Sequence, residues 1–235
     1  MTELDNNALT KRWQQVLEQI SQAEKSAGRE SGSVQLLAVS KLHSAEAIRC
    51  VYEAGQRCFA ENYVQEALAK MQALADLKIE WHLIGPLQSN KTREVAEHFA
   101  WVHSVDRLKI AQRLSAQRPL LLPPLNICLQ VNIDDEASKS GCSLEQLPAL
   151  VEAVLALPNL CLRGLMCIPQ AGNHHALTAL AKTHSQLVAR LPALTQQPFD
   201  TLSMGMSDDL SEAVAAGSTM VRIGTAIFGA RVSTN

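Results

Sequence analysis

The sequence predicts a single α/β domain that folds as a (β/α)8 barrel, or TIM barrel, with one extra helix at its N-terminus. Short apolar runs rich in β-branched residues alternate with segments whose apolar residues recur at helical spacing. Eight such units fit into 235 residues, close to the usual length of this barrel. The alternation predicts a parallel sheet, because parallel neighbours need a crossover connection. A doubly wound open sheet is the alternative, but no G-x-G-x-x-G motif follows the first strand.

The expected elements divide residues 1–235 into an N-terminal helix within 1–28 and a barrel over 34–229, with no linker and no second domain. The N-terminal helix covers Leu4–Ala27. The eight expected strands are Val34–Lys41, Arg57–Tyr63, Glu80–Pro86, Trp101–Asp106, Leu125–Ile133, Leu160–Pro169, Asp200–Ser207 and Met220–Gly229. Helical spacing follows over Ser44–Ala54, Asn62–Leu77, Asn90–Phe99 and Ser143–Leu157. Several helices begin at good N-cap residues: Ser44, Ser89, Asp106, Ser143 and Asp208.

Composition and charge exclude several classes of protein. Lys and Arg number 21 against 23 Asp and Glu, so a nucleic-acid binder that works by charge alone is excluded. No apolar run approaches the ~18 residues that cross a bilayer, and the N-terminus does not resemble a signal peptide. The six cysteines form no C-x-x-C pair and are expected to pack as small apolar residues. We therefore expect a soluble, cytoplasmic protein that binds neither nucleic acid nor membrane.

The fifth expected strand provides an internal check on the barrel. Its polar residues alternate with apolar ones, so they share one face: Asn126, Cys128, Gln130 and Asn132. The outer face of a barrel packs against helices and must be apolar, so the polar face points inward. Asn126 and Gln130 either contact a polar ligand or satisfy one another. Asn132 lies nearest the C-terminal mouth and is the better candidate for a functional residue.

The first candidate for chemistry is Lys41, because functional residues of this fold lie at the C-terminal ends of the strands. Period two places Lys41 on the same face as Val39 and Leu37, with its stem over apolar layers at the mouth. An amine in that position is available as a nucleophile. A lysine that merely closes the strand and extends its ammonium group into water is an equally good reading of position alone.

The last two strands favour the first reading. In this fold the loops after strands seven and eight often bind phosphate through backbone N–H groups. Ser207 and Thr225 add hydroxyl donors there, and Gly224 allows close approach of the backbone. Arg222 points inward, because its two neighbours pack outward, and a buried arginine needs an acceptor. A lysine amine, a phosphate cradle and an inward arginine together suit pyridoxal 5′-phosphate (PLP) held as a Schiff base.

The order of several motifs carries a resemblance to a known family. The runs are AVSK, ENYVQE, WHLIGPLQSNK, SKSG, LRGLM, DTLSMGMSDD and GSTMVRIGTAIFGAR, between about Leu36 and Arg231. In these runs the chain resembles the pyridoxal phosphate homeostasis proteins, a family once named after proline-synthetase co-transcribed genes. The resemblance implies a barrel similar to the N-terminal domain of alanine racemase.

The resemblance also implies roles for particular residues. Lys41 would be the Schiff-base lysine, which forms a covalent aldimine with PLP, and Asn62 would lie at the pocket wall. Ser207, Gly224 and Thr225 would hold the phosphate, and Arg222 would face the pyridine nitrogen. No metal is implied.

The function expected from this resemblance is non-catalytic. The protein would hold, buffer or deliver PLP, would hand it to apo forms of PLP-dependent enzymes, and would thereby act in vitamin B6 and amino-acid metabolism. The chain stops soon after the eighth strand, without the second domain that supplies a catalytic tyrosine in alanine racemase, and a monomer is expected. The alternatives are a small racemase or lyase that uses Tyr63 as a second base, and a barrel that binds phosphorylated sugars without PLP.

Five other residues carry weaker expectations. His174 and His175 are expected in a solvated loop rather than in a metal site, because no third ligand is near them in sequence. Lys139 is expected to be a loop lysine. His82 and His103 lie within expected strands and are expected to pack in the core or at the mouth.

Overall fold

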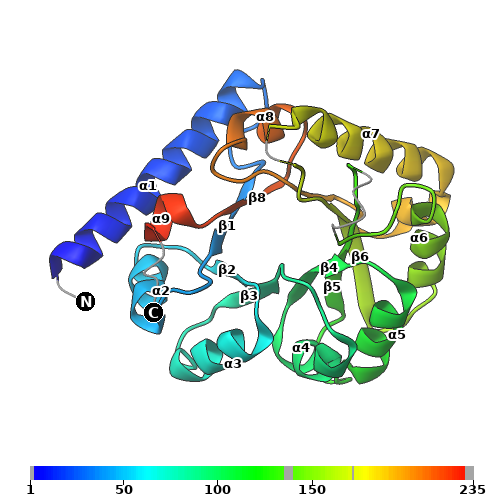
Figure 1. Cartoon of the computed structure of the whole chain (residues 1–235), viewed down its shortest axis with the longest axis horizontal. Coiled ribbons are helices and arrows are strands. Elements are labelled where there is room, and N and C mark those ends of the chain that lie inside the picture. The colour runs from blue at the N-terminus through cyan, green and yellow to red at the C-terminus, as the bar shows by residue number, and fades with distance from the viewer. Residues whose placement is uncertain (1–2, 135–139, 171, 231–235) are drawn as a thin grey trace.

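The chain forms a closed barrel of eight parallel strands in the order β1-β2-β3-β4-β5-β6-β7-β8, with β8 paired to β1. This computed structural model describes residues 3–134, 140–170 and 172–230. Figure 1 shows the strands as a ring with the helices outside it. The TIM barrel with an extra N-terminal helix is therefore confirmed.

The strands are short and the helices vary in length. The strands are β1 (Gln35–Val39), β2 (Cys58–Glu61), β3 (Glu80–Leu83), β4 (Trp101–Val105), β5 (Leu125–Gln130), β6 (Leu160–Met166), β7 (Thr201–Ser203) and β8 (Met220–Ile223). The helices are α1 (Glu3–Ser26), α2 (Ala45–Glu53), α3 (Val64–Ala73), α4 (Thr92–His98), α5 (Leu108–Gln117), α6 (Leu147–Leu155), α7 (His174–Arg190), α8 (Leu210–Ala215) and α9 (Thr225–Phe228), with 3-10 turns η1 (Ser89–Lys91) and η2 (Pro192–Gln196).

The largest correction to the expected elements concerns the last one. The expected strand Met220–Gly229 is β8 only as far as Ile223, and the rest forms the short helix α9. The backbone N–H groups of Ile227 and Phe228 both donate to the carbonyl of Gly224 at 2.9 Å, which closes a helical turn. This turn buries both side chains, so their apolar character reflects burial in a helix and not in a strand.

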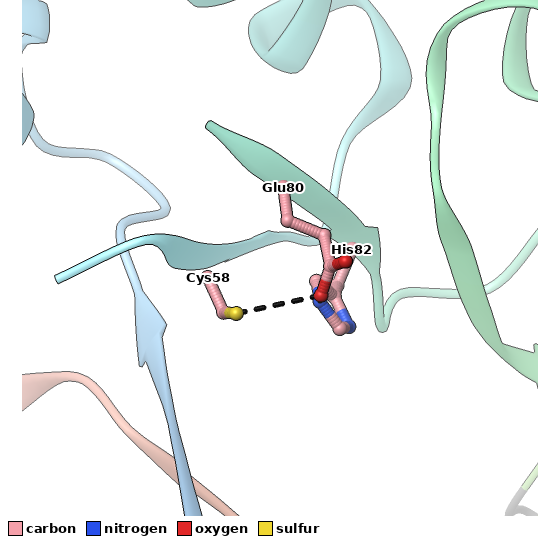
Figure 2. A group of neighbouring side chains, drawn as sticks. All are labelled: Cys58, Glu80 and His82. Atoms are coloured by element: carbon pink, nitrogen blue, oxygen red, sulfur yellow. Dashed lines mark hydrogen bonds and ion pairs between the residues drawn. The ribbon is translucent and has the colours of Figure 1, made fainter. Parts of the chain in front are cut away.

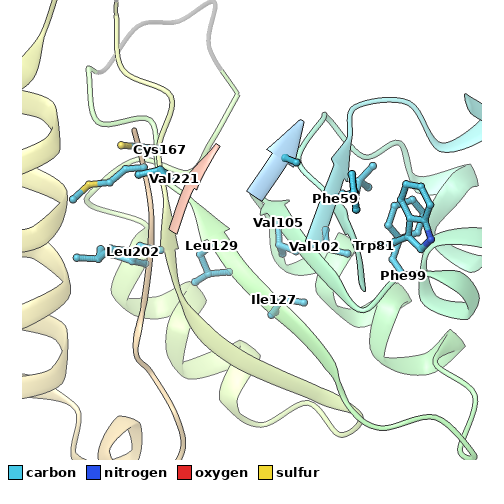
Figure 3. Packing of buried hydrophobic residues seen from close by; sticks show 14 of the residues in the cluster. Phe59, Trp81, Phe99, Val102, Val105, Ile127, Leu129, Cys167, Leu202 and Val221 are labelled. Carbon is cyan, nitrogen blue, oxygen red and sulfur yellow. The ribbon is translucent and has the colours of Figure 1, made fainter. Parts of the chain in front are cut away.

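Two apolar layers hold the barrel together. The outer layer lies between strands and helices and includes the residues labelled in Figure 3, such as Phe59, Phe99 and Ile127. A smaller inner layer fills the barrel and contains Leu37, Val39, Cys58, Ala60, Trp101, Cys128, Met166 and Met220. The two sets alternate residue by residue along β1 and β2, as period two requires.

Helix α1 lies along the side of the barrel where β1 and β8 meet (Figure 1). It buries one apolar face, formed by Leu9, Val16, Ile20 and Ala23. Arg12 Nε donates to the carbonyl of Ile227 at 2.7 Å, and Trp13 Nε1 donates to Gln56 at 3.0 Å. These bonds attach the helix to α9 and to the loop before β2. Within the described ranges, no helix has the length and apolar character needed to cross a membrane.

Only some of the expected N-caps have that role. Ser44 caps α2, since its side chain accepts from the N–H of Ala47 at 3.3 Å. Arg107, and not Asp106, is the N-cap residue of α5, and Asp209, and not Asp208, is that of α8. Ser143 accepts from the N–H of Gln146 one turn before α6 begins.

Asn126 and Gln130, the polar residues of β5, do not bond to one another. Asn126 bonds to groups away from the mouth of the barrel. Asn126 donates to the carbonyl of Ala100 at 3.3 Å and accepts from Arg163 at 3.2 Å. Gln130 donates to the carbonyl of Ser140 at 3.1 Å. The amides of Asn126 and Gln130 therefore bond to loop carbonyls and to β6.

Candidate functional site

All six residues expected to bind PLP line one cavity of about 480 Å³ at the C-terminal mouth of the barrel: Lys41, Asn62, Ser207, Arg222, Gly224 and Thr225. The other lining residues are Val39, Ile84, Ile168, Met206 and Asp208. This volume lies within the usual range for cofactor pockets. Residues from six loops or strand ends therefore converge as the fold predicts.

Lys41 lies in the turn after β1 and not in the strand itself. The strand ends at Val39, two residues earlier than expected. The next residue after the lysine, Leu42, has a φ of 62° and is 54% exposed. A left-handed conformation is unfavourable for leucine, and such strain persists only where the surroundings fix the backbone.

A buried charge network fixes the backbone on both sides of Lys41. Lys70 Nζ donates to the carbonyl of Ser40 at 2.8 Å, to Glu61 at 2.8 Å and to Glu66 at 2.7 Å. Ser40 Oγ donates to Glu61 at 2.6 Å, and Glu66 accepts from the N–H of Leu42 at 2.6 Å. Burial raises the pKa of the Glu61 carboxyl, and the Lys70 ammonium opposes that shift. The network holds the turn that presents Lys41.

Arg222 is a buried cation at the floor of the cavity. Its side chain donates to the carbonyl of Ser203 at 2.5 Å, to Ser203 Oγ at 2.9 Å and to the carbonyl of Cys167 at 2.8 Å. It forms no ion pair with any carboxylate of the described residues, although it is only 3% exposed. Burial lowers the pKa of this guanidinium. A buried arginine without a carboxylate favours a ligand that offers an acceptor.

A chain of buried hydrogen bonds runs from Arg222 through the barrel interior. Ser203 Oγ lies 2.8 Å from His103 Nδ1, His103 Nε2 lies 2.9 Å from His82 Nδ1, and His82 Nε2 lies 3.0 Å from Glu80. Burial lowers the pKa of both histidines, so both are neutral, and the partnership with His82 lowers the pKa of Glu80.

Only one direction satisfies this chain when Glu80 is ionised. His82 must donate from Nε2 to Glu80, His103 must donate from Nε2 to His82, and Ser203 must donate to His103. The expectation that these histidines pack in the core is confirmed by their complete burial, and the chain adds a polar function to that packing.

Asn62 forms the wall between β2 and β3. Its Oδ1 atom is buried and has no hydrogen-bond partner among the described residues, so this amide is available to a ligand. A Cβ atom at Gly85 would collide with the backbone carbonyl of Asn62, so only glycine allows the segment after β3 to approach so closely.

The opposite wall is open and polar. Ser207 and Thr225 are exposed hydroxyls, while a Cβ at Gly224 would lie 3.1 Å from the carbonyl of Val39. Asp208 also lines this cavity, which corrects the expectation that its carboxylate caps the next helix. Its negative charge lies on the same wall as the two hydroxyls.

A second hollow, of about 620 Å³, lies between α1 and α8 and shares Ser207 and Asp208 with the first. Its lining, as far as the structure describes it, contains two carboxylates and neither lysine nor arginine, so its charge does not suit a phosphate.

The remaining candidates lie elsewhere. Tyr63 is 59% exposed and is not a lining residue of the cavity. His174 and His175 begin α7 and are therefore helical, contrary to the expected loop. Lys139 lies outside the described residues.

The sequence pattern did not single out the network behind Lys41. One feature of the sequence indicates this network: the acidic residue Glu61 ends the apolar run CFAE. Burying an unpaired carboxylate there would lower the stability of the fold, so a partner is expected. The partner Lys70 lies on the following helix, and no sequence spacing shows that its amine reaches Ser40.

The fold and the site define a barrel of the alanine racemase type with an amine, hydroxyls and a buried arginine at its mouth. The family model described as "Alanine racemase, N-terminal domain" matches residues 11–232. The alanine racemase of Corynebacterium glutamicum has a TM-score of 0.71 at 14% identity over 98% of this chain and 63% of that one, which shows the shared fold alone.

More similar proteins specify the family. A pyridoxal phosphate homeostasis protein of Pseudomonas aeruginosa is 59% identical over 92% of this chain and 93% of its own length. One from Escherichia coli K12 is 53% identical over 92% and 94%. The structure of PipY from Synechococcus elongatus with PLP bound has a TM-score of 0.77 at 39% identity, over 89% of this chain and 100% of that one. The chain belongs to the pyridoxal phosphate homeostasis protein family.

Proposed function

We propose that this protein binds PLP in the cavity at the mouth of the barrel and holds, buffers and delivers the cofactor. The observation that carries this proposal is the convergence of Lys41, the three phosphate-binding candidates and Arg222 around one cavity. The names of its relatives and the PLP-bound PipY structure support the same function.

The side chains of the cavity fit this cofactor. The phosphate takes donors from Ser207 and Thr225 and from the backbone beside Gly224. Among the described residues, no carboxylate pairs with the buried Arg222 and no group bonds to the buried Asn62 oxygen, so both side chains can bond to the cofactor ring or its substituents. When bound, PLP supplies an aldehyde that reacts with an amine.

The amine in this proposal is Lys41. Its Nζ atom attacks the aldehyde, water leaves, and an imine (Schiff base) links the chain to the cofactor. The loaded protein should be yellow, and borohydride reduction followed by mass mapping should label Lys41. A label on another lysine, or unchanged labelling in Lys41→Ala, would overturn this assignment.

The same geometry favours a carrier over an enzyme. An arginine is always protonated, so Arg222 donates to the pyridine nitrogen and keeps it neutral, which weakens the electron withdrawal that most PLP reactions need. Tyr63, the second base required by the racemase hypothesis, does not line the cavity.

Two assays separate these functions. A carrier should transfer PLP to an apo form of a PLP-dependent enzyme and should leave L-alanine unchanged. Appearance of D-alanine at a rate that depends on Lys41 would instead establish racemisation.

We place this delivery in the cytoplasm. All six cysteines are free, a state that a reducing compartment maintains. The proposed form is a monomeric single domain, which sedimentation of the PLP-loaded protein tests directly.

A further inference from the structure

Three side chains with metal-binding atoms meet at the N-terminal end of the barrel, opposite the cavity. Cys58 is the first residue of β2 and Glu80 the first of β3, and the register of the two strands pairs them. His82 follows two residues later on the same face (Figure 2). The thiol, carboxylate and imidazole atoms all lie within 4.8 Å of one another.

The individual distances are near those of a coordination shell. Cys58 Sγ lies 3.4 Å from Glu80 Oε1, and Glu80 Oε1 lies 3.0 Å from His82 Nε2. Ligands around tetrahedral Zn²⁺ are about 3.4–3.6 Å apart, given metal–ligand bonds of about 2.0–2.3 Å. Outward movement of the carboxylate by a few tenths of an ångström makes room for the ion.

We propose that Cys58, Glu80 and His82 form a binding site for a divalent cation of the Zn²⁺ class. A thiolate and a carboxylate neutralise the two positive charges, and the imidazole adds a neutral nitrogen, which is the ligand set that this borderline-soft cation prefers.

Neighbouring groups orient the histidine ligand. His82 Nδ1 is held by His103, and its ring stacks on Trp101 at 5.3 Å with an interplanar angle of 10°. Nε2 therefore faces the other two ligands. In zinc sites, the second ring nitrogen of a histidine ligand usually donates a hydrogen bond to a neighbouring group, which fixes the ring orientation.

A fourth ligand is also within reach. The Gln35 side-chain amide lies 2.9 Å from Cys58 Sγ. Turning this amide over directs its oxygen, which is a metal ligand, towards the site. Water supplies the fourth ligand otherwise.

The site is accessible from solvent. The Glu80 side chain is 43% exposed, which gives an ion a path from solvent. Cys58 binds the ion as a thiolate, so metal binding releases the Cys58 proton to solvent.

Occupation of this site also reverses the hydrogen-bonded chain to Arg222. The metal takes Nε2 of His82, so the ring proton moves to Nδ1 and is donated to His103. His103 then carries its own proton on Nδ1 and donates it to Ser203 Oγ. The hydroxyl proton of Ser203 therefore rotates away from His103. Each imidazole keeps one proton, but Nδ1 of both rings changes from acceptor to donor, and Ser203 Oγ, the partner of Arg222, changes from donor to acceptor towards His103.

Calorimetric titration of the full-length protein with Zn²⁺ tests the site. We expect one saturable equivalent in the wild type and in Cys161→Ser, a control thiol on β6. In Cys58→Ser, a nearly isosteric change, affinity should fall at least about tenfold. Equal Zn²⁺ binding by Cys58→Ser and wild type, or no saturable binding by the wild type, would overturn the proposal.

Two further measurements keep the test independent of folding. Co²⁺ should give the wild type an absorption band from sulfur-to-metal charge transfer, as a difference from Cys58→Ser. Glu80→Gln, a half-exposed change, should weaken this band, and ¹⁵N NMR should show the His82 proton moving from Nε2 to Nδ1 on addition of Zn²⁺. A histidine tautomer that does not respond would contradict the proposed ligand set.

Discussion

Lys70 Nζ lies 2.8 Å from the carbonyl oxygen of Ser40, the residue directly before Lys41. A second, buried lysine thus anchors the turn that presents the proposed nucleophile. Its partners Glu61 and Glu66 extend the contact to the other side of the turn, at the N–H of Leu42.

The first prediction concerns this anchor. Lys70→Met leaves Glu61 buried without its cation, so the free energy of unfolding should fall by about 3–5 kcal/mol. PLP uptake should also slow, because the turn that carries Lys41 loses the hydrogen bond from Lys70 to the carbonyl of Ser40. Urea denaturation and PLP titration measure both effects, with the exposed Lys78→Met as control. Glu66→Gln is the milder variant, and an unchanged rate of Lys41 labelling in it would contradict the positioning role.

The second prediction concerns the charge of Asp208. This exposed carboxylate lies on the proposed phosphate-binding wall and repels the phosphate. Asp208→Asn should therefore bind PLP about two- to fivefold more tightly, as expected for an exposed charge pair, and should release it more slowly. Glu212→Gln, which removes an exposed carboxylate outside the cavity, should change neither quantity. Weaker binding by Asp208→Asn would show that the carboxylate itself contacts the cofactor.

The third prediction separates binding from stability at Asn62. Its Oδ1 atom has no partner among the described residues, so Asn62→Ala breaks no hydrogen bond of that oxygen. The free energy of unfolding without PLP should change by less than about 1 kcal/mol. PLP affinity should fall about tenfold, which corresponds to one hydrogen bond. Gln65→Ala is the exposed control, and a large loss of stability at Asn62 would mean that its role is structural.

The fourth prediction follows from the buried histidines. The pKa values of His82 and His103 are lowered in the folded protein, so below about pH 6.5 the unfolded chain binds protons that the folded chain does not. Stability is therefore full above that pH and falls as the pH drops, by up to about 1.4 kcal/mol per pH unit for each histidine.

Urea denaturation between pH 7 and 5 measures this slope. His103→Gln should reduce it by about one proton. An unaltered slope in His103→Gln would mean that this imidazole does not remain neutral in the folded state.

The barrel and its mouth could be predicted from sequence because both follow from local patterns. Period two sorts Arg222 and its neighbours into inner and outer faces, and the strand ends must then meet at one rim. The boundary of β8 could not be predicted, since Ile227 and Phe228 are equally apolar in a strand and in a helical turn.

The contacts within the barrel could not be predicted from sequence. Ser203 lies 100 residues from its partner His103, and only the closed register brings the two side chains together. The bond from Lys70 to Ser40 likewise depends on the packing of α3 on β2, which no local spacing specifies.

The pairing of Leu37 with Arg222 joins the first strand to the eighth. A chain emerging from the ribosome therefore exposes Lys41 long before Arg222 and the proposed phosphate-binding residues after β7 and β8 exist. Assembly of the proposed site must wait until synthesis is nearly complete.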